Sequence, residues 1–269
     1  MDALALLRLQ IEWGADEALE DAPVDRLRAG SQAAAQGQEA RAGQAGVPAP
    51  SPRRAPPAPA ALPTSATPTS RAAALAGQAQ TLDALRAALA AFDGCALRDT
   101  AANLVFAAGN PESGLLLIGE PPGEAEDRSG LPFAGPDGAL LDRMLASIAL
   151  TRDNLLLTPM IPWRPPGGRP PNPAEIALCV PFLHRLIALV KPARMVIAGP
   201  LAARTLIGTP RRRSAPAWAD IAVPGHPPPV PALAMPNPAM VARTPGARRE
   251  AWAALRLLRR TLDADFAKT

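Results

Sequence analysis

The chain has 269 residues, of which 48% are hydrophobic, 19% charged and 3% aromatic, and it contains two cysteines. Two cysteines cannot form the disulfide framework of a small secreted protein, and the opening residues 1–3 lack the basic stretch of a signal peptide. No apolar run approaches the ~20 residues that a membrane-spanning helix needs. We therefore expect a cytoplasmic protein that does not enter a membrane.

The basic charge of the chain comes almost wholly from arginine. The net charge is +4, and Lys191 and Lys268 are its two lysines. Arginine pairs with phosphate through a planar fork and stacks on bases, so the composition is compatible with a nucleic-acid partner. A bias of the whole chain toward Ala, Arg and Pro explains the same composition, and both interpretations stay open at this point.

The first 75 residues are expected to form a helix followed by a linker. Leu4, Leu7 and Ile11 recur at helical spacing, which predicts one short amphipathic helix within residues 1–28. Residues 29–75 are rich in Ala, Gly, Pro and Ser with almost no large apolar side chains, so we expect a disordered linker there. The tethered helix then either docks on a protein partner or is a frayed tail.

Residues 76–269 are expected to form the folded domain. A predicted helix over 81–92 precedes five apolar segments typical of strands, at 104–106, 115–118, 155–157, 195–197 and 232–235. Helical patterns cover 140–148 and 176–190, and a last helix over 248–262 carries Trp252, Leu255 and Leu258 on one side. This alternation predicts an α/β fold with a short, mostly parallel central sheet and helices on both of its faces.

The most informative sequence blocks follow the segment 115–118. The first runs from Gly119 to Asp127, and the next is Pro132-Phe133-Ala134-Gly135 before a leucine-rich helix. Later blocks begin at Trp163 and at Asn237. In order and spacing they resemble the uracil-DNA glycosylase superfamily, and most of all its family four, over about residues 93–262. The resemblance implies a uracil-DNA glycosylase-like fold and hydrolysis of the N-glycosidic bond of a deaminated base flipped out of DNA.

A base-binding site is predicted in the loops of the first two blocks. In an open α/β sheet, ligands bind beyond the carboxyl ends of the strands, where these loops should lie. Gly119 and Gly123 flank two prolines, Pro121 among them, in a rigid turn that lets a substrate approach the backbone closely. Phe133 is placed to stack on the flipped base, as the resemblance implies, or else it is a core residue that closes its loop.

DNA contacts are predicted on two other segments. Arg164 and Arg169 lie in a Pro- and Gly-rich loop, and there, as at Arg243, a guanidinium group can hold phosphates around an extruded nucleotide. Taken singly, an arginine in such a loop is more often a solvated charge. The resemblance implies that the segment from Met240 and Val241 to Arg243 enters the gap that the flipped base leaves in the duplex.

The chemistry is expected to depend on residues that depart from the family's pattern. The resemblance places Pro159 where the family has the Asn that reads the uracil edge, and Asn237 where it has a His that steadies the departing base. Proline donates no hydrogen bond, whereas the Asn237 amide still can. We therefore expect Asn237 to stabilise the leaving group and Glu120 to orient water, with Glu124 and Asp127 as alternative carboxylates.

A metal cofactor is not expected. Family four holds a four-iron four-sulfur cluster on four cysteines, and the resemblance places Phe92, Cys95, Trp163 and Cys179 at the matching positions. Two thiolates cannot saturate such a cluster, which leaves the cluster as the disfavoured alternative. Phe92 and Trp163 would fill its volume, and Cys95 and Cys179 would remain as buried thiols.

Two classes of function follow from these expectations. The first is a divergent DNA glycosylase that acts as a monomer in base-excision DNA repair. The second is a catalytically impaired module on the same fold that binds DNA or a protein partner without turnover. Pro159 favours impaired uracil chemistry, whereas the blocks around Gly119, Phe133 and Arg164 favour retained contact with DNA.

Overall fold

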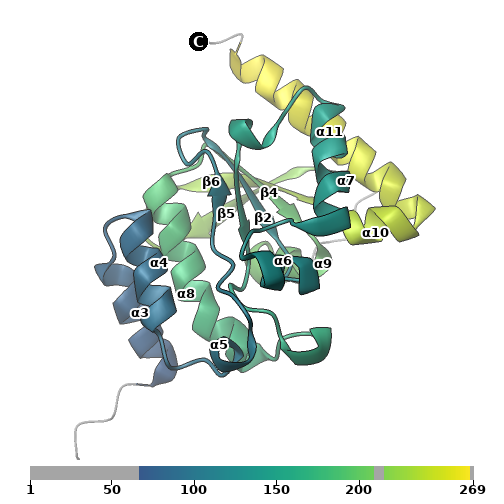
Figure 1. Ribbon diagram of the computed structural model, residues 1–269. Coiled ribbons are helices and arrows are strands. Elements are labelled where there is room, and N and C mark those ends of the chain that lie inside the picture. Colours follow the sequence, from purple (N-terminus) through teal and green to yellow (C-terminus); the bar gives the residue numbers. More distant parts are fainter. Residues whose placement is uncertain (1–66, 209–214, 267–269) are drawn as a thin grey trace, which may run out of the picture. The chain divides into compact units, whose positions relative to one another are not determined.

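The structure, a computed structural model, describes residues 67–208 and 215–266. The helix expected within residues 1–28 and most of the expected linker lie outside these residues. Figure 1 shows a central sheet with helices packed on both of its faces, as the sequence predicts.

The sheet has six strands in the order β1-β3-β2-β4-β6-β5. The four inner strands, β3 (Leu156–Pro159), β2 (Leu115–Gly119), β4 (Arg194–Ala198) and β6 (His226–Met235), run parallel to one another. The edge strands β1 (Ala108–Gly109) and β5 (Trp218–Val223) are antiparallel to their neighbours. Because the inner strands are parallel, the loops that follow them meet at one edge of the sheet.

Both edges of the sheet differ from the expected strands. Residues 104–106 form no strand, and the backbone N–H of Val105 instead donates to the carbonyl of Pro162 at 2.8 Å in a loop. Strand β5 was not expected, because only Ile221 and Val223 of this short segment are buried, and the residues before them, Ala219 and Asp220, are small or polar. It is held by antiparallel pairing with β6 across the turn at Gly225.

Alternating side chains of the inner strands face two hydrophobic cores. Leu115, Leu117 and Val196 belong to the core that α7 (Gly135–Ala146) and α11 (Pro245–Phe266) complete. The next residues along the strands belong to the core that α4 (Leu82–Ala91) and α8 (Pro173–Val190) complete. In Figure 1, α7 and α11 accordingly lie on one side of the sheet, and α4 and α8 lie on the other. The helices on both faces therefore confirm the predicted fold class.

Helix α8 is long and apolar enough to cross a membrane by length and composition. Several of its residues, among them Phe182, Leu183 and Leu186, are buried in the core beneath the sheet. At its start, the side chain of Asn172 accepts a hydrogen bond from the backbone N–H of Glu175 at 2.8 Å. Its apolar character therefore matches a core helix of this domain.

The folded part of the chain begins earlier than residue 76. Helix α3 (Pro68–Gln78) covers a segment that the sequence analysis assigned to the linker, and it packs against α8. Ala72 and Ala76 are buried at this contact, since alanine lets two helices approach closely without a large apolar side chain. The sequence does carry a helix-start signal here, Thr67 followed by Pro68, but the segment lacks the large apolar residues from which the other helices were predicted.

Short helices follow the inner strands. Helix α6 (Glu124–Ser129) follows β2, α9 (Pro200–Leu206) follows β4, and α10 (Pro238–Arg243) follows β6. Elsewhere lie α5 (Leu97–Thr100) and two 3-10 turns, Arg152–Asn154 and Pro166–Gly168. The N-terminal ends of α6, α9 and α10, with their backbone N–H groups, therefore lie at the carboxyl edge of the sheet.

The expected grouping of residues on the last helix is wrong in one respect. Leu255 and Leu258 are each 2% exposed in the core, as expected, but Trp252 is 47% exposed. The core face of α11 is formed instead by alanines with these leucines, including Ala251 and Ala254. Trp252 is therefore a surface residue.

Candidate active site

A cavity of about 270 Å³ opens at the carboxyl ends of β2, β3 and β6. Its walls come from the turn after β2, the loop around Phe133, the end of β3 and the start of α10. Of the residues predicted for the site, those that line it are Glu120, Pro121, Gly123, Phe133, Pro159 and Asn237. The structure thus brings the two predicted catalytic residues and the predicted base-binding residues other than Gly119 to one cavity.

Gly119 lies beneath the ring of Phe133. A Cβ atom at Gly119 would lie 2.5 Å from Cζ of this ring, so a larger residue there would displace it. Phe133 is 7% exposed and packs in the core with α7, yet it also lines the cavity. Phe133 is therefore a core residue whose ring also reaches the cavity, and its stacking on a flipped base stays a prediction.

The backbone of Phe133 is held in a conformation that side-chain-bearing residues rarely adopt. Its φ angle is 52°, in the left-handed region. The guanidinium of Arg152 donates to the Phe133 carbonyl at 2.6 Å and to the carboxylate of Asp142 at 2.7 Å. A Cβ atom at Gly138 would collide with the same carbonyl. The sequence analysis missed Arg152, because it lies 19 residues from Phe133 in the chain.

The carboxylate of Glu126 joins two walls of the cavity. One oxygen accepts a hydrogen bond from the backbone N–H of Gly123 at 2.7 Å, and the other accepts one from the N–H of Phe133 at 2.6 Å. Burial raises the pKa of Glu126, and the two N–H donors oppose this rise. The sequence analysis gave Glu126 no role, although its position three residues after the helix-capping Gly123 is typical of a capping contact.

Glu120 ties the end of β2 to the helix after β4. Its Oε1 accepts hydrogen bonds from the backbone N–H groups of Leu201 at 2.8 Å and Ala202 at 3.3 Å. Gly199, with φ of 125°, leaves room for this carboxyl group. Burial raises the pKa of Glu120, while the two N–H donors lower it. Among the described residues no donor reaches Oε2, so this oxygen is available at the cavity.

Asn237 is the N-terminal cap of α10. Its Oδ1 accepts a hydrogen bond from the backbone N–H of Met240 at 2.8 Å. This bond identifies the oxygen of the side-chain amide, because an N–H group needs an acceptor. No acceptor for Nδ2 is found within the described part of the chain, which leaves a donor at the wall of the cavity.

The two alternative carboxylates have other partners. Glu124 lines the cavity but pairs with Arg128 on the exposed side of α6. Asp127 is buried and accepts hydrogen bonds from the backbone N–H groups of Ala102 at 2.9 Å and Asn103 at 3.3 Å. Asp127 therefore anchors a neighbouring loop and does not line the cavity.

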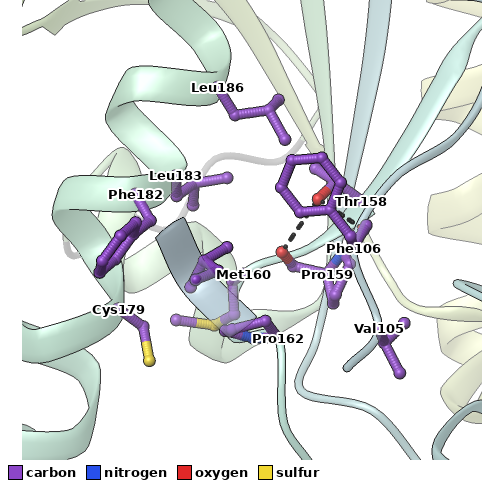
Figure 2. A pocket seen from close by; sticks show the side chains of 11 residues that line it. Val105, Phe106, Thr158, Pro159, Met160, Pro162, Cys179, Phe182, Leu183 and Leu186 are labelled. Atoms are coloured by element: carbon purple, nitrogen blue, oxygen red, sulfur yellow. Dashed lines mark hydrogen bonds between the residues drawn. The ribbon is translucent and has the colours of Figure 1, made fainter. Parts of the chain in front are cut away.

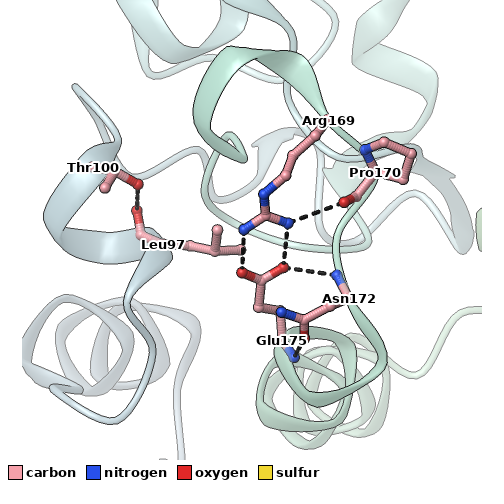
Figure 3. Close-up of polar contacts among 6 residues, drawn as sticks. All are labelled: Leu97, Thr100, Arg169, Pro170, Asn172 and Glu175. Atoms are coloured by element: carbon pink, nitrogen blue, oxygen red, sulfur yellow. Dashed lines mark hydrogen bonds and ion pairs between the residues drawn. The ribbon is translucent and has the colours of Figure 1, made fainter. Parts of the chain in front are cut away.

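The arginines predicted to contact DNA are not gathered around the cavity. Figure 3 shows that the guanidinium of Arg169 forms a two-pronged pair with the carboxylate of Glu175, with N–O distances of 2.6 and 2.9 Å, and also donates to the carbonyl of Pro170. This pair, helped by the N–H of Asn172, lowers the pKa of Glu175 despite its burial. Arg164 does not line the cavity, and its Nε is buried without a partner among the described residues.

The predicted duplex-entering segment is helical. Met240 is 39% exposed and Arg243 is exposed on α10. Val241, in contrast, is 5% exposed and packs in the core, so the prediction that it contacts DNA is wrong for this conformation. Val241 and Met240 point in different directions, because consecutive side chains of a helix are about 100° apart around its axis.

The four positions matched to cluster ligands lie together in the core between the sheet and α8. Phe92, Cys95, Trp163 and Cys179 are each at most 2% exposed, and the ring of Phe92 lies 5.4 Å from that of Phe182. Figure 2 shows Cys179 and Phe182 on α8 facing Met160 and Pro162 across a gap of only about 20 Å³. Two thiols and two aromatic rings do not match the four thiolates that a four-iron cluster needs.

The two thiols interact with each other. A hydrogen bond with Cys179 lowers the pKa of Cys95 to about 7. The same contact, together with burial, raises the pKa of Cys179. In the described residues, no group of three or more His, Cys, Asp or Glu side chains is arranged to hold a metal ion.

Comparisons with known proteins connect this site to a family. The family model for the uracil DNA glycosylase superfamily matches residues 106–256, which is more than half of the chain. The type-4 uracil-DNA glycosylase of Pyrobaculum aerophilum is 34% identical over 122 residues, covering 45% of this chain and 62% of that protein. The type-4 uracil-DNA glycosylase of Archaeoglobus fulgidus is 39% identical over 110 residues, covering 41% of this chain and 55% of that protein. The chain thus matches about three fifths or less of the length of these relatives.

Proposed function

Because the chain belongs to the uracil-DNA glycosylase superfamily, we propose that it is a DNA repair protein that hydrolyses the bond between a deaminated base and deoxyribose. The observation that carries this proposal is that Phe133, Glu120 and Asn237 line the same cavity. Its volume of about 270 Å³ is close to the ~300 Å³ at which small-ligand sites begin. A base inside a duplex reaches such a cavity only when it is flipped out of the stack.

The flipped base is held by packing. The ring of Phe133 offers an apolar surface for stacking, and the small residues of the turn from Pro121 to Gly123 let the base approach the backbone. Glu126 and Arg152 fix the Phe133 backbone from two sides, so the ring is in place before the base arrives. Such preorganisation lowers the entropy cost of binding.

The chemical step separates charge between the base and the sugar. A water oxygen forms a bond to C1′ of the sugar while the bond from C1′ to the base nitrogen breaks, and its electron pair leaves with the base. Asn237 Nδ2 donates a hydrogen bond to an oxygen of the anionic base, which is a contribution of ~100- to 1,000-fold in rate for one such donor. Glu120 Oε2 orients the water and accepts its proton.

Base selectivity is expected to be relaxed. Pro159 lies at the end of β3 in the wall of the cavity and has no donor for the edge of a pyrimidine. A two-pronged reader is worth ~1 to 3 kcal/mol of discrimination between bases, and its loss leaves selection to shape and to Asn237. We therefore propose that uracil is not strongly preferred over hypoxanthine or xanthine.

The proposed reaction uses no metal. Two of the positions that match cluster ligands are filled by the packed rings of Phe92 and Trp163, and the other two are the buried thiols Cys95 and Cys179 of the same core. This core supports the fold on the side of the sheet away from Phe133. We infer that hydrophobic packing does there what a cluster does in family four.

A catalytically impaired DNA-binding module is the second candidate, and Pro159 favours it. The two candidate functions are distinguished by incubating the protein with oligonucleotides that carry uracil, hypoxanthine or xanthine and scoring abasic sites. Release of any of these bases supports the glycosylase. Binding to the same duplexes that weakens with salt, without product on any of them, supports the module and contradicts our proposal.

The Asn237→Asp variant tests the chemical role of the Asn237 amide. Aspartate keeps the oxygen that caps α10, so the helix and the unfolding free energy should change little. It replaces the donor by a negative charge, so single-turnover excision should fall by at least ~100-fold. Asn237→Ser, which keeps both a cap and a short donor, is the matched control and should lose less. Equal excision by Asn237→Asp and the unaltered protein would contradict the role.

A further inference from the structure

A stripe of exposed arginines surrounds Trp252 on helix α11. Trp252 is 47% exposed, and Arg248, Arg249, Arg256 and Arg260 are all exposed. Residues three and four apart are neighbours on a helix, so Arg248, Arg249 and Arg256 lie next to Trp252, and Arg260 lies one turn beyond Arg256. We call these five residues the Trp252 stripe. The Trp252 stripe thus combines an aromatic face with four positive charges, the combination that surfaces binding single-stranded nucleic acid present.

The arginines of the Trp252 stripe form no ion pairs with other described residues. None of its four guanidinium groups has an ion pair or side-chain hydrogen bond with another described residue. The acids of α11 lie elsewhere or are occupied, since Asp263 pairs with Arg259 and Asp265 with Arg194. Glu250, two residues before Trp252, does not face it. The stripe therefore presents positive charge that an anionic partner can neutralise.

The stripe continues the surface that is proposed to meet DNA. Helix α10 packs against α11, and the chain passes from Arg243 through Thr244 directly into Pro245. Figure 1 shows α10 beside the start of α11, on the far side of the sheet from α4 and α8. The backbone N–H of Arg248 donates to the carbonyl of Thr244, the residue that caps the end of α10, at 3.1 Å, so Arg248 lies one helical turn after it. The other end of α10 begins at Asn237 in the wall of the cavity.

We propose that the Trp252 stripe binds a single strand of DNA beside the cavity, with the indole stacked on an unpaired base and the arginines on phosphates. Stacking on an aromatic ring requires an exposed base face, which a closed duplex does not offer. From Arg248 to Arg260 the helix rises ~18 Å, enough to follow several nucleotides. This inference extends the proposed action on DNA, but it concerns undamaged strand and does not require turnover.

The test measures binding of the full chain to a fluorescent 20-nucleotide strand without uracil, and to the matching duplex, by anisotropy at several salt concentrations. Trp252→Ala is expected to weaken single-strand binding about tenfold and duplex binding less than about twofold. Trp252→Phe, which keeps an aromatic face, should retain most of the affinity. Arg249→Ala with Arg256→Ala should lower the slope of log affinity against log salt by about 1.4, at roughly 0.7 for each phosphate contact.

Arg86→Ala with Arg98→Ala is the matched control, because it removes two exposed arginines from α4 and α5 instead. Thermal unfolding of each variant checks that the fold is unchanged. The inference is overturned if Trp252→Ala binds like the unaltered chain, if the control loses as much, or if the stripe variants lose binding to anionic phospholipid vesicles and not to DNA. Excision is measured in parallel, so single-strand binding without excision would contradict the proposed function and leave this inference standing.

Discussion

At the scale of single residues, the site depends on Glu126 more than on any carboxylate that the sequence analysis selected. Its two oxygens hold the N–H of Gly123 and the N–H of Phe133, so one side chain sets the distance between the turn after β2 and the aromatic wall. The contact with Gly123 has a sequence signal in the capping position of Glu126. The contact with Phe133 has none, since Phe133 reaches Glu126 only because α6 ends and the chain turns back at Gly130, with φ of 71°.

Glu126→Gln is expected to damage catalysis more than stability. Glutamine keeps one acceptor oxygen, but its NH₂ group cannot accept from the second N–H, which costs ~1 to 3 kcal/mol of unfolding free energy. A small shift of the Phe133 ring should slow single-turnover excision by ~100-fold. Glu112→Gln is the control, because Glu112 is exposed and does not line the cavity. Equal rates for the two variants would contradict the role of Glu126.

The raised pKa values of Glu120 and Glu126 predict opposite effects of pH on stability and on rate. Burial raises both pKa values above the usual 4.5, so the folded protein binds protons more tightly than the unfolded chain in that range. Their contribution to stability is therefore present below about pH 4.5 and is lost as pH rises through the folded pKa values. Excision should instead rise over the same range, because both proposed roles need the carboxylate.

The measurement compares unfolding free energy and single-turnover rate between pH 4.5 and 8. Glu120→Gln and Glu126→Gln should each flatten the dependence of stability on pH, since the titrating group is gone. A rate for the unaltered protein that is constant down to pH 4.5 would contradict this prediction, because then no carboxylate whose ionised form the reaction needs titrates in this range.

At the scale of elements, the loop before α8 shows why a motif does not fix a role. The sequence places Arg169 in a Pro- and Gly-rich loop suited to phosphate, but the start of α8 places Glu175 within reach, and the guanidinium is held there. Arg243 has no such partner among the described residues, because α10 ends at it on an exposed side.

Arg169→Ala should therefore leave the salt dependence of duplex binding unchanged. Arg243→Ala should reduce the slope of log affinity against log salt by about 0.9, the value for one lost phosphate contact on a duplex. Both are measured by anisotropy on the same uracil-free duplex. A reduced slope for Arg169→Ala would mean that its pair with Glu175 opens when DNA binds.

At the scale of the whole molecule, the parts of the fold predicted correctly are those with strong periodic patterns. The apolar runs of β2 and β4 and the repeats of α7 and α8 are long enough to identify their elements. Helix α3 and strand β5 were missed, because α3 depends on alanines that pack against α8 and β5 depends on its pairing with β6. The grouping of Trp252 with Leu255 was wrong, since alanines complete the core face of α11.

For the site too, residues in sequence motifs were predicted, and residues that act through tertiary contacts were missed. Phe133 and Asn237 line one cavity, because parallel strands bring their carboxyl ends together, whereas Arg164 does not line it. The residues that hold them, Glu126 and Arg152, were missed, since their contacts join loops rather than neighbours in sequence.

The stability of the folded protein should depend on aromatic packing at the positions that match cluster ligands. Trp163 is 2% exposed in the core, so Trp163→Ala should lower the unfolding free energy by ~3 to 5 kcal/mol. A chelator should leave the melting temperature unchanged, and a thiol reagent should modify Cys95 and Cys179 only after unfolding, because both are buried. Iron analysis and visible absorbance of freshly purified protein complete the measurement. Near-stoichiometric iron that is lost together with stability on chelation would show that a metal, and not Phe92 and Trp163, supports this side of the sheet.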